Sequence, residues 1–378
     1  MRKRIIILGI LAVAGLVLIL YLIGQTHTYT DYEVLSSVER TDDETVKITS
    51  FKGNVLKYGS DGISLTDLSN NIIWNQSFEI ESNEIVKSEE YVAVVETGGT
   101  QIYLFGEEGF VSKIETKRQT VRAAVSDIGT VATIEYEDGV NYIELFDSEG
   151  NELAEGEAHI ENNGTPVSIA LSPSGTLMAV VYFDYSSGEV ASTVTFYNFG
   201  SVGQNEIDNI VSTNETDSVI AEIEFVTDDK CIAFGNNIIQ VYKGKQKPSL
   251  DKEIEVEEEI ESVFCENERF GYVVCNEDEV YSASSDAEEE SLYTINVYNY
   301  KGRRLYQTGF DMSYDKIEVL ENTEVCIMGT TSCEILSKWG KPRFIYTFEQ
   351  NLLEVFSASS MHSYEVILSD HTEHIRLK

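Results

Sequence analysis

The sequence predicts an all-β protein: a β-propeller of about eight four-stranded blades, preceded by one transmembrane helix. Three observations support this fold class. Residues 5–23 form an uncharged apolar run. Short segments of alternating apolar and polar residues, separated by Gly, Asp and Asn, fill the rest of the chain. One strand motif recurs at intervals of about 40 residues, which is the period of propeller blades.

The apolar run follows the basic sequence Met1-Arg-Lys-Arg4. At a helical rise of 1.5 Å per residue it spans about 28 Å, which matches the hydrocarbon core of a bilayer. A cleaved signal peptide usually has a shorter apolar region and a small-residue cleavage site, and residues 21–26 offer no such site. Since the basic flank stays in the cytoplasm, the rest of the chain is expected outside. The expected order is a cytoplasmic tip at 1–4, a retained signal-anchor at 5–23, a polar stalk at 24–30 and a single extracytoplasmic domain at 31–378.

The recurring motif is an apolar pair, an aromatic residue and a polar turn that ends in Gly. Clear copies are Val194-Thr-Phe-Tyr197 before Gly200 and Val297-Tyr298 before Gly302. We interpret each copy as the third strand of a blade, with seven blades as the alternative if the weak first or last copy is not a separate blade. The positions taken as equivalent are Thr66, Phe105, Phe146, Tyr197, Tyr242, Tyr298, Leu336 and Ile375.

The last blade has only three strands when it is counted in this way. A fourth strand is needed, because an unpaired outer strand invites aggregation. Residues 32–38 precede the first repeat and alternate suitably. We therefore predict that this segment completes the last blade and joins the two ends of the ring, and that the first blade begins near Thr45.

Two segments carry a family resemblance. Residues 62–74, Gly-Ile-Ser-Leu-Thr-Asp-Leu-Ser-Asn-Asn-Ile-Ile-Trp, resemble a pyrroloquinoline-quinone-type propeller repeat, and Ser172-Pro-Ser-Gly175 is similar to the blade turn of WD-like and TolB-like propellers. The whole chain resembles a bacterial family of signal-anchored propeller proteins of unknown function. The resemblance implies a fold and carries no activity.

Composition narrows the choice of partners. The formal net charge is −38, from 65 acids and 27 bases, so the surface repels phosphate backbones and a nucleic-acid partner is not expected. Such a surface favours solubility beside an anionic membrane or wall, with recruitment of basic partners or cations as the alternative. The five cysteines form no close pair, so buried thiols are expected. If Gly329-Thr330 is a two-residue turn, however, Cys326 and Cys333 face each other and could pair.

Two hairpins are longer than a minimal blade requires. They join the second and third strands of the fourth blade, at 183–189, and of the sixth, at 276–291. Loops held by a rigid scaffold often bind partners, so we treat this face as a candidate site for a protein or cell-wall partner, against the alternative of neutral variation in loop length. No cofactor is predicted; the acids are ligands that Ca²⁺ accepts, but the spacing of a Ca²⁺ loop is absent. The candidate residues are Asp184, Tyr185, Glu189, Asp278, Glu279, Tyr281, Asp286, Glu288, Glu289 and Glu290.

Catalytic motifs are not evident: the sequence has no phosphate-binding loop and no nucleophile elbow. We therefore name no catalytic, cofactor-binding or metal residue. The expected function is that of a binding or scaffolding module, tethered to the cell membrane, whose ligand is unknown. The alternative is a propeller enzyme, carbohydrate-active or quinone-dependent, that uses carboxylates on the propeller axis.

Overall fold

The structure is a computed structural model that describes residues 27–41, 45–158, 164–185, 188, 190–276, 291–360 and 362–378. The expected cytoplasmic tip and signal-anchor lie outside these residues. Within the described ranges, no helix is long and apolar enough to cross a membrane.

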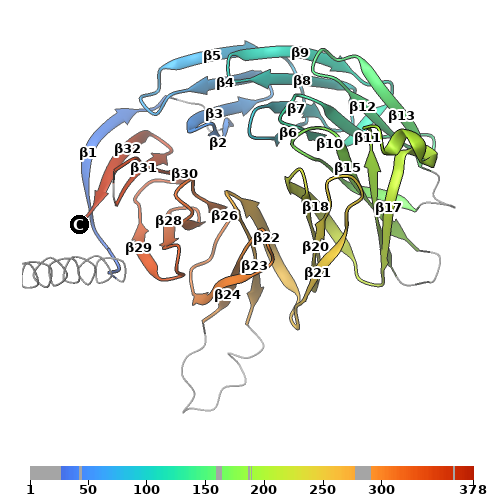
Figure 1. Ribbon diagram of the computed structural model, residues 1–378. Coiled ribbons are helices and arrows are strands. Elements are labelled where there is room, and N and C mark those ends of the chain that lie inside the picture. Colours follow the sequence, from blue (N-terminus) through green and yellow to red (C-terminus); the bar gives the residue numbers. More distant parts are fainter. Residues whose placement is uncertain are drawn as a thin grey trace, which may run out of the picture.

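The described residues form eight antiparallel sheets of four strands each, arranged around a common centre (Figure 1). The fold is therefore an eight-bladed propeller, and the seven-bladed alternative is wrong. We label the strands of each blade A to D, from the centre to the rim. Because neighbouring strands are antiparallel, the A–B and C–D turns of every blade open on one face and the B–C and D–A connections on the other. We call these the C–D face and the B–C face.

The strands of blades 1 to 4, in the order A to D, have the following bounds. Blade 1 contains β2 (Lys47–Phe51), β3 (Asn54–Gly59), β4 (Gly62–Thr66) and β5 (Ile72–Ser77); blade 2 contains β6 (Asn83–Lys87), β7 (Val92–Glu96), β8 (Gln101–Gly106) and β9 (Gly109–Glu115). Blade 3 contains β10 (Gln119–Val125), β11 (Val131–Glu137), β12 (Val140–Phe146) and β13 (Glu152–Ala158); blade 4 contains β14 (Thr165–Leu171), β15 (Leu177–Asp184), β16 (Ala191–Asn198) and β17 (Ile210–Thr216).

The strands of blades 5 to 8 follow in the same order. Blade 5 contains β18 (Ile220–Thr227), β19 (Lys230–Gly235), β20 (Ile238–Lys243) and β21 (Ser249–Glu255); blade 6 contains β22 (Ile260–Glu266), β23 (Arg269–Cys275), β24 (Tyr293–Asn299) and β25 (Arg304–Phe310). Blade 7 contains β26 (Lys316–Val319), β27 (Val325–Met328), β28 (Ser332–Leu336) and β29 (Pro342–Thr347); blade 8 contains β30 (Leu352–Ser357), β31 (Ser363–Leu368), β32 (His371–Leu377) and β1 (Tyr32–Glu39).

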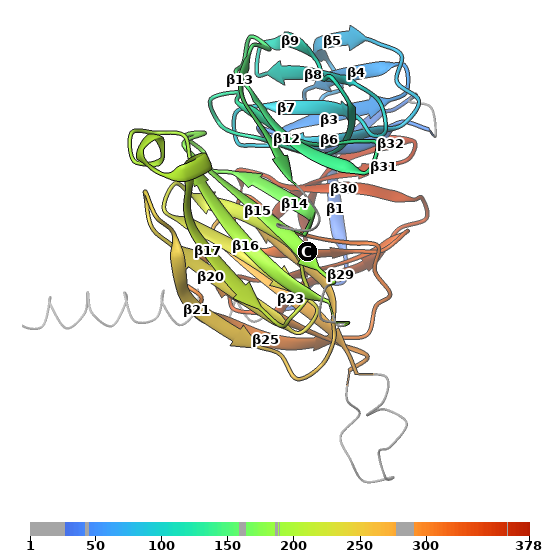
Figure 2. The ribbon, with the colours of Figure 1, turned by 90° about the vertical axis from the view of Figure 1, so that its right-hand side faces the viewer.

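The only helical segments in the described part of the chain are two short 3₁₀ turns. These are η1 (Gly203–Asn205) and η2 (Ile207–Asn209), in the C–D connection of blade 4. Figure 2 shows this connection projecting from the yellow-green blade. The extra length that the sequence has in the fourth repeat is therefore shared between both faces of the propeller.

The hydrophobic core lies between blades. B strands are covered by their neighbours on both faces, so they are continuously apolar: the first six residues of β15 are all buried. D strands line the rim and are mostly exposed, as in β21. Each core cluster joins two blades; Val181 of blade 4, for example, packs in one cluster with Ile223 and Tyr242 of blade 5. A single blade therefore cannot bury its own apolar faces.

The recurring third-strand motif corresponds to the C strands. All eight equivalent positions fall in C strands, and at each of them the pairing with strand D is interrupted by a bulge. In blade 6 the turn is closed by Asn299, whose Oδ1 accepts hydrogen bonds from the amides of Lys301 and Arg303 at 3.0 and 3.1 Å. Gly302 adopts a φ of 66° there, a left-handed conformation that favours glycine. The motif therefore encodes a turn with a bulge, which tilts the outer strand.

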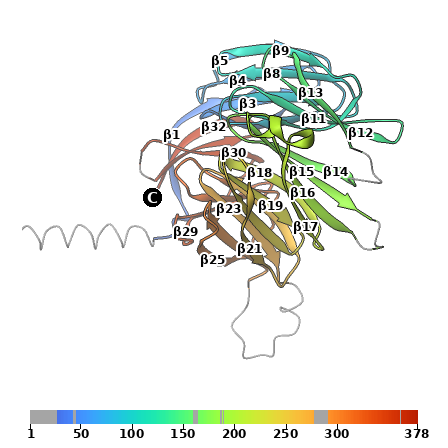
Figure 3. The same ribbon diagram turned by 45° about the vertical axis from the view of Figure 1, so that its right-hand side comes forward.

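The ring closes through its first strand. β1 pairs with β32 in antiparallel register, from Tyr32 opposite Leu377 to Glu39 opposite His371, and the two strands lie side by side in Figure 3. The Tyr32 hydroxyl also donates a 3.1 Å hydrogen bond to Glu373. The segment expected at 32–38 is thus the D strand of blade 8, and both ends of the described chain meet in one sheet.

The segment before β1 differs from the expected stalk. The Tyr29 amide donates to the carbonyl of Arg343, and the Tyr29 carbonyl accepts from the amide of Ile345. The Thr28 hydroxyl donates to the Pro342 carbonyl at 2.9 Å. Residues 28 and 29 therefore extend the outer edge of β29 at the C–D face, because backbone groups on an unpaired strand edge bind an extended chain readily.

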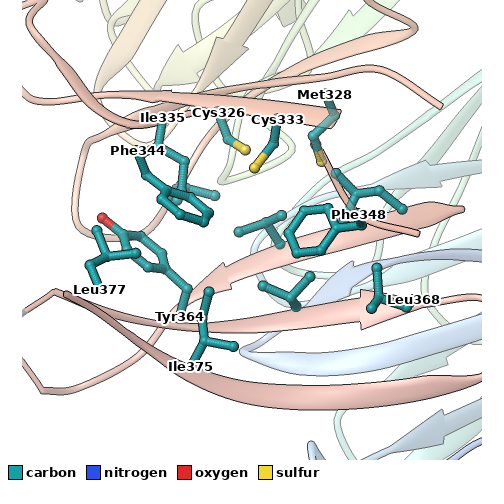
Figure 4. Packing of buried hydrophobic residues seen from close by; sticks show 14 residues of the cluster. Cys326, Met328, Cys333, Ile335, Phe344, Phe348, Tyr364, Leu368, Ile375 and Leu377 are labelled. Atoms are coloured by element: carbon teal, nitrogen blue, oxygen red, sulfur yellow. The ribbon is translucent and has the colours of Figure 1, made fainter. Parts of the chain in front are cut away.

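The cysteine register also differs from the expected one. Met328 lies opposite Cys333, and Cys326 lies opposite Ile335, because the turn is at Thr330-Thr331, one residue later than expected. The two thiols are therefore diagonal neighbours on one face of blade 7, where their sulfur atoms point toward each other (Figure 4). Both are free and buried.

We predict that Asn299→Ala lowers the free energy of unfolding by about 1 kcal/mol, because two turn amides lose their acceptor. Denaturant unfolding of the purified protein measures this change. Asn299→Asp is the matched control: it keeps an acceptor oxygen and should retain most of the stability. Equal stability of the alanine variant and the parent would show that the side chain does not hold the turn.

Candidate functional site

The A strands of all eight blades line a cavity of about 920 Å³ on the propeller axis. Its lining continues into the A–B turns, at Lys52 and Asn267 for example, so the cavity extends toward the C–D face. Several charged residues of the A strands lie on its wall. In β18, Glu222 and Glu224 line the cavity, and Ile223 between them also packs into the core between blades 4 and 5.

One side of the cavity is rich in carboxylates. Glu222, Glu224, Glu266 and Glu318 line it from blades 5, 6 and 7. Lys87 approaches from blade 2 and donates hydrogen bonds to the Thr49 hydroxyl and the Ser50 carbonyl at 2.9 and 3.1 Å. Negative charge therefore exceeds positive charge on this part of the wall.

The environment raises the pKa of several of these carboxyl groups. Burial, followed by the charge of Glu222, raises the pKa of Glu224 to about 8. Burial also raises the pKa of Glu222 and of Glu266. At neutral pH the wall thus carries fewer charges than its number of acids suggests.

Glu318 and Glu354 share one lysine at the junction of blades 7 and 8. The Lys316 Nζ atom lies 2.9 Å from Glu354 Oε2 and forms a second ion pair with Glu318. Burial and the adjacent Glu318 raise the pKa of Glu354 to about 8. Burial by itself would raise the pKa of Glu318, but the Lys316 ammonium and the hydrogen bond with Glu354 lower this pKa overall. One proton is therefore held between the two carboxylates.

Two carboxylates with separated pKa values are typical of acid–base catalysis. The Glu354 side chain has no exposed surface, however, so a substrate in the cavity cannot reach it. The arrangement therefore neutralises a buried junction between blades rather than presenting a proton at the surface.

No group of three or more His, Cys, Asp or Glu side chains among the described residues is arranged to hold a metal ion. The Ca²⁺ expectation concerned the acids of both long hairpins. Because all of these acids except Asp184 lie outside the described residues, it stays a prediction.

Of the sequence-predicted binding residues, the structure describes Asp184 and Tyr185. Asp184 ends β15 on the B–C face. Tyr185 follows it with 57% of its surface exposed and contacts Phe183 edge-on at 6.3 Å. The remaining candidates lie outside the described residues, namely Glu189, Asp278, Glu279, Tyr281, Asp286, Glu288, Glu289 and Glu290.

A second charged cluster, in blade 3, was missed by the sequence analysis. Arg118, in the link from blade 2, contacts Glu144 Oε1 at 2.7 Å and lies 3.5 Å from the centre of the Tyr142 ring. The side chains of Glu135 and Glu144 have no exposed surface. Burial raises the pKa of Glu135 to about 7. One feature of the sequence could have indicated this cluster, namely opposite charges that lie about one repeat apart. Lys117, for example, pairs with Glu155, 38 residues later.

We predict that the free energy of unfolding falls as the pH rises from 5 to 8. The pKa values of Glu135, Glu224 and Glu354 are higher in the folded chain than the ordinary value near 4.3. The folded state therefore binds more protons than the unfolded state between about pH 4 and 8, and stability is lost as the pH rises through this range. Urea unfolding at several pH values measures the trend.

Glu354→Gln should flatten this pH dependence, because it removes one of the carboxyl groups whose pKa is raised. Glu115→Gln is the control, since Glu115 is exposed and its pKa is lowered by Lys113. A free energy of unfolding that rises from pH 5 to 8 would contradict the assignment.

Comparisons with solved structures identify the same fold in other proteins. BamB from Moraxella catarrhalis superposes with a TM-score of 0.51 at 11% identity, over 92% of this chain and 100% of that one. Sqt1 from Saccharomyces cerevisiae superposes with a TM-score of 0.53 at 10% identity, over 92% of this chain and 100% of that one. Such identities establish the fold alone.

No curated protein matches the sequence. A family model, described as a family of unknown function (DUF5711), matches residues 25–377. This match covers almost the whole chain, propeller included. The chain therefore belongs to the DUF5711 family of unknown function.

Proposed function

We propose that this protein is a membrane-tethered binding or scaffolding module that meets a protein or cell-wall partner outside the cytoplasm, on its B–C face. The tether is the apolar segment 5–23. Its length, its lack of charge and its basic flank support this role.

The opposite placement of tether and long hairpins carries the proposal. Thr28 joins the rim beside Pro342, where β29 begins at the C–D face. The connection from β15 to β16 and the connection from β23 to β24 leave from the other ends of the strands, on the B–C face. A partner bound to these hairpins would not compete with the tether for space.

The closed ring supports a scaffolding role. Core clusters between blades link the sheets around the axis, so the strand ends that carry the loops of the B–C face keep fixed relative positions. A rigid support of this kind lowers the entropy that a bound loop loses. Tyr185 offers an exposed aromatic ring on this face, a residue type that is enriched in interfaces.

We predict that protease added to intact cells digests the propeller or its N-terminal connection and leaves the anchor in the membrane. The basic flank at residues 2–4 would hold the N-terminus inside. Immunoblotting with N-terminal and C-terminal tags measures the cleavage. A C-terminal tag that is lost only after permeabilisation would contradict the proposed topology.

We predict that replacing residues 277–290 by a short Gly–Ser linker removes at least one crosslinked partner of the full-length protein in cells. The matched control replaces residues 203–209, the long connection of the C–D face, and should leave the partner profile unchanged. Identical profiles for the parent and the 277–290 variant would exclude this hairpin as the binding site.

The alternative that this protein is a propeller enzyme is tested by a separate experiment. Glu224 and Glu266 are the accessible carboxylates to test, because both line the axial cavity. Saturable turnover of a glycoside or an alcohol by the full chain, lost in Glu224→Gln or Glu266→Gln, would overturn the binding-module proposal.

A further inference from the structure

The C–D turns of the propeller are divided by charge. The C–D turns of blades 1 to 3 are acidic, with Asp67, Glu107 and Asp147 among their residues. The C–D turns of blades 5 to 7 are basic. We call the latter the basic rim, and its exposed residues are Lys243, Lys245, Lys247, Lys301, Arg303, Arg304, Lys338 and Lys341.

The basic rim coincides with acid-free stretches of the sequence. Residues 232–250, 297–310 and 335–348 contain no Asp or Glu, although the chain has 65 such residues among 378. Each stretch includes the end of a C strand, the C–D turn and the start of the D strand. The absence of acids is therefore a property of the C–D turns of blades 5 to 7, and not of the A–B turns on the same face, which carry Asp228, Glu268 and Glu321.

Most charges of the basic rim lack an acidic partner. Lys247 pairs with Glu206 at 2.5 Å, and Arg304 donates a hydrogen bond to Gln307 at 3.1 Å. For the rest of the basic rim, no ion pair with another described residue is present. Unpaired cations on a chain of net charge −38 leave a local positive surface.

Apolar side chains lie among these cations. Trp339 is 63% exposed, and Lys338 lies over its ring at 5.2 Å. Leu250 and Leu305, the second residues of the D strands of blades 5 and 6, are also exposed. Tryptophan beside Lys and Arg is typical of protein surfaces at the membrane–water interface, where the ring is partly apolar and the cations meet headgroups.

The tether would bring this sector close to a bilayer. Thr28 is bonded to Pro342, the residue after Lys341 of the basic rim. Only five residue steps separate Thr28 from Ile23, the end of the proposed anchor, so this connection spans at most about 17 Å. An anionic surface attracts Lys and Arg within roughly a Debye length of 8–10 Å.

We propose that the basic rim docks on the anionic lipid headgroups of the membrane that holds the anchor, with Trp339 entering the interface. This docking proposal depends on the proposed tether and extends it, because docking would set the orientation of the propeller. Blades 5 to 7 face the lipid, the acidic turns of blades 1 to 3 are directed away from it, and the B–C face stays open to partners.

The two tryptophans of the chain allow a direct test. Trp339 belongs to the basic rim, whereas Trp74 stacks on Phe105 and donates to the Glu107 carbonyl at 3.0 Å, on the acidic side. Full-length Trp74→Phe and Trp339→Phe are each reconstituted into vesicles with brominated lipid as the quencher. We expect quenching of Trp339 in vesicles that contain phosphatidylglycerol, and little quenching of Trp74.

Charge dependence is tested in the Trp74→Phe background. Lys301→Gln with Lys341→Gln should reduce the quenching of Trp339, as should vesicles of phosphatidylcholine alone. The control changes Lys47 and Lys113 to Gln, two exposed bases outside the basic rim. Quenching that is equal in all vesicles and variants, or equal for the two tryptophans, would overturn the docking surface.

Flotation of the same vesicles separates the two proposals. If the full chain fails to float with vesicles in high salt, the anchor proposal fails and the docking surface fails with it. If the chain floats but Trp339 is not quenched, the tether stands and the basic rim does not dock. Binding of a soluble anionic wall polymer to the basic rim, with no quenching of Trp339 by brominated lipid, would also overturn the proposal.

Discussion

The structure depends on the pairing of β1 with β32. Every blade buries its apolar faces against two neighbours, so a ring that stays open leaves two sheets uncovered. Supplying the D strand of blade 8 from residues before blade 1 joins sequence-distant segments in one sheet. It also fixes where the preceding chain leaves the disc, because β1 enters blade 8 from the C–D face and residues 28 and 29 already lie along β29.

Much of the fold could be predicted from the sequence because the C strands carry two constraints at once. Residues such as Phe105 and Tyr298 are core residues, and each also begins the bulge that precedes a glycine-containing turn. Register was harder to predict. The expected turn begins at Gly329, one residue too early, and this shifts the expected partner of each β27 residue by two positions along β28. In the structure Cys326 therefore faces Ile335 and not Cys333.

The charged sites could not be found from residue type, because 65 acids give no contrast. What distinguishes them is contact across blades. Lys52 meets Glu90, Lys117 meets Glu155 and Lys316 meets Glu354, and each pair is 38 residues apart. A search for opposite charges one repeat apart would have found these pairs. It would not have given their pKa values, which depend on burial that only the packed ring provides.

Net charge alone describes this protein poorly. A uniformly acidic disc beside an anionic bilayer would be repelled, and a short connection to an anchor would then hold it under constant repulsion. With the proposed tether, the acid-free turns near Pro342 would remove that conflict where the connection meets the rim. The acidic turns of blades 1 to 3 would then assist orientation, because their repulsion and the attraction of blades 5 to 7 act in the same rotational sense. Charge position, rather than the total of −38, is therefore the property that would decide how this propeller sits at a membrane.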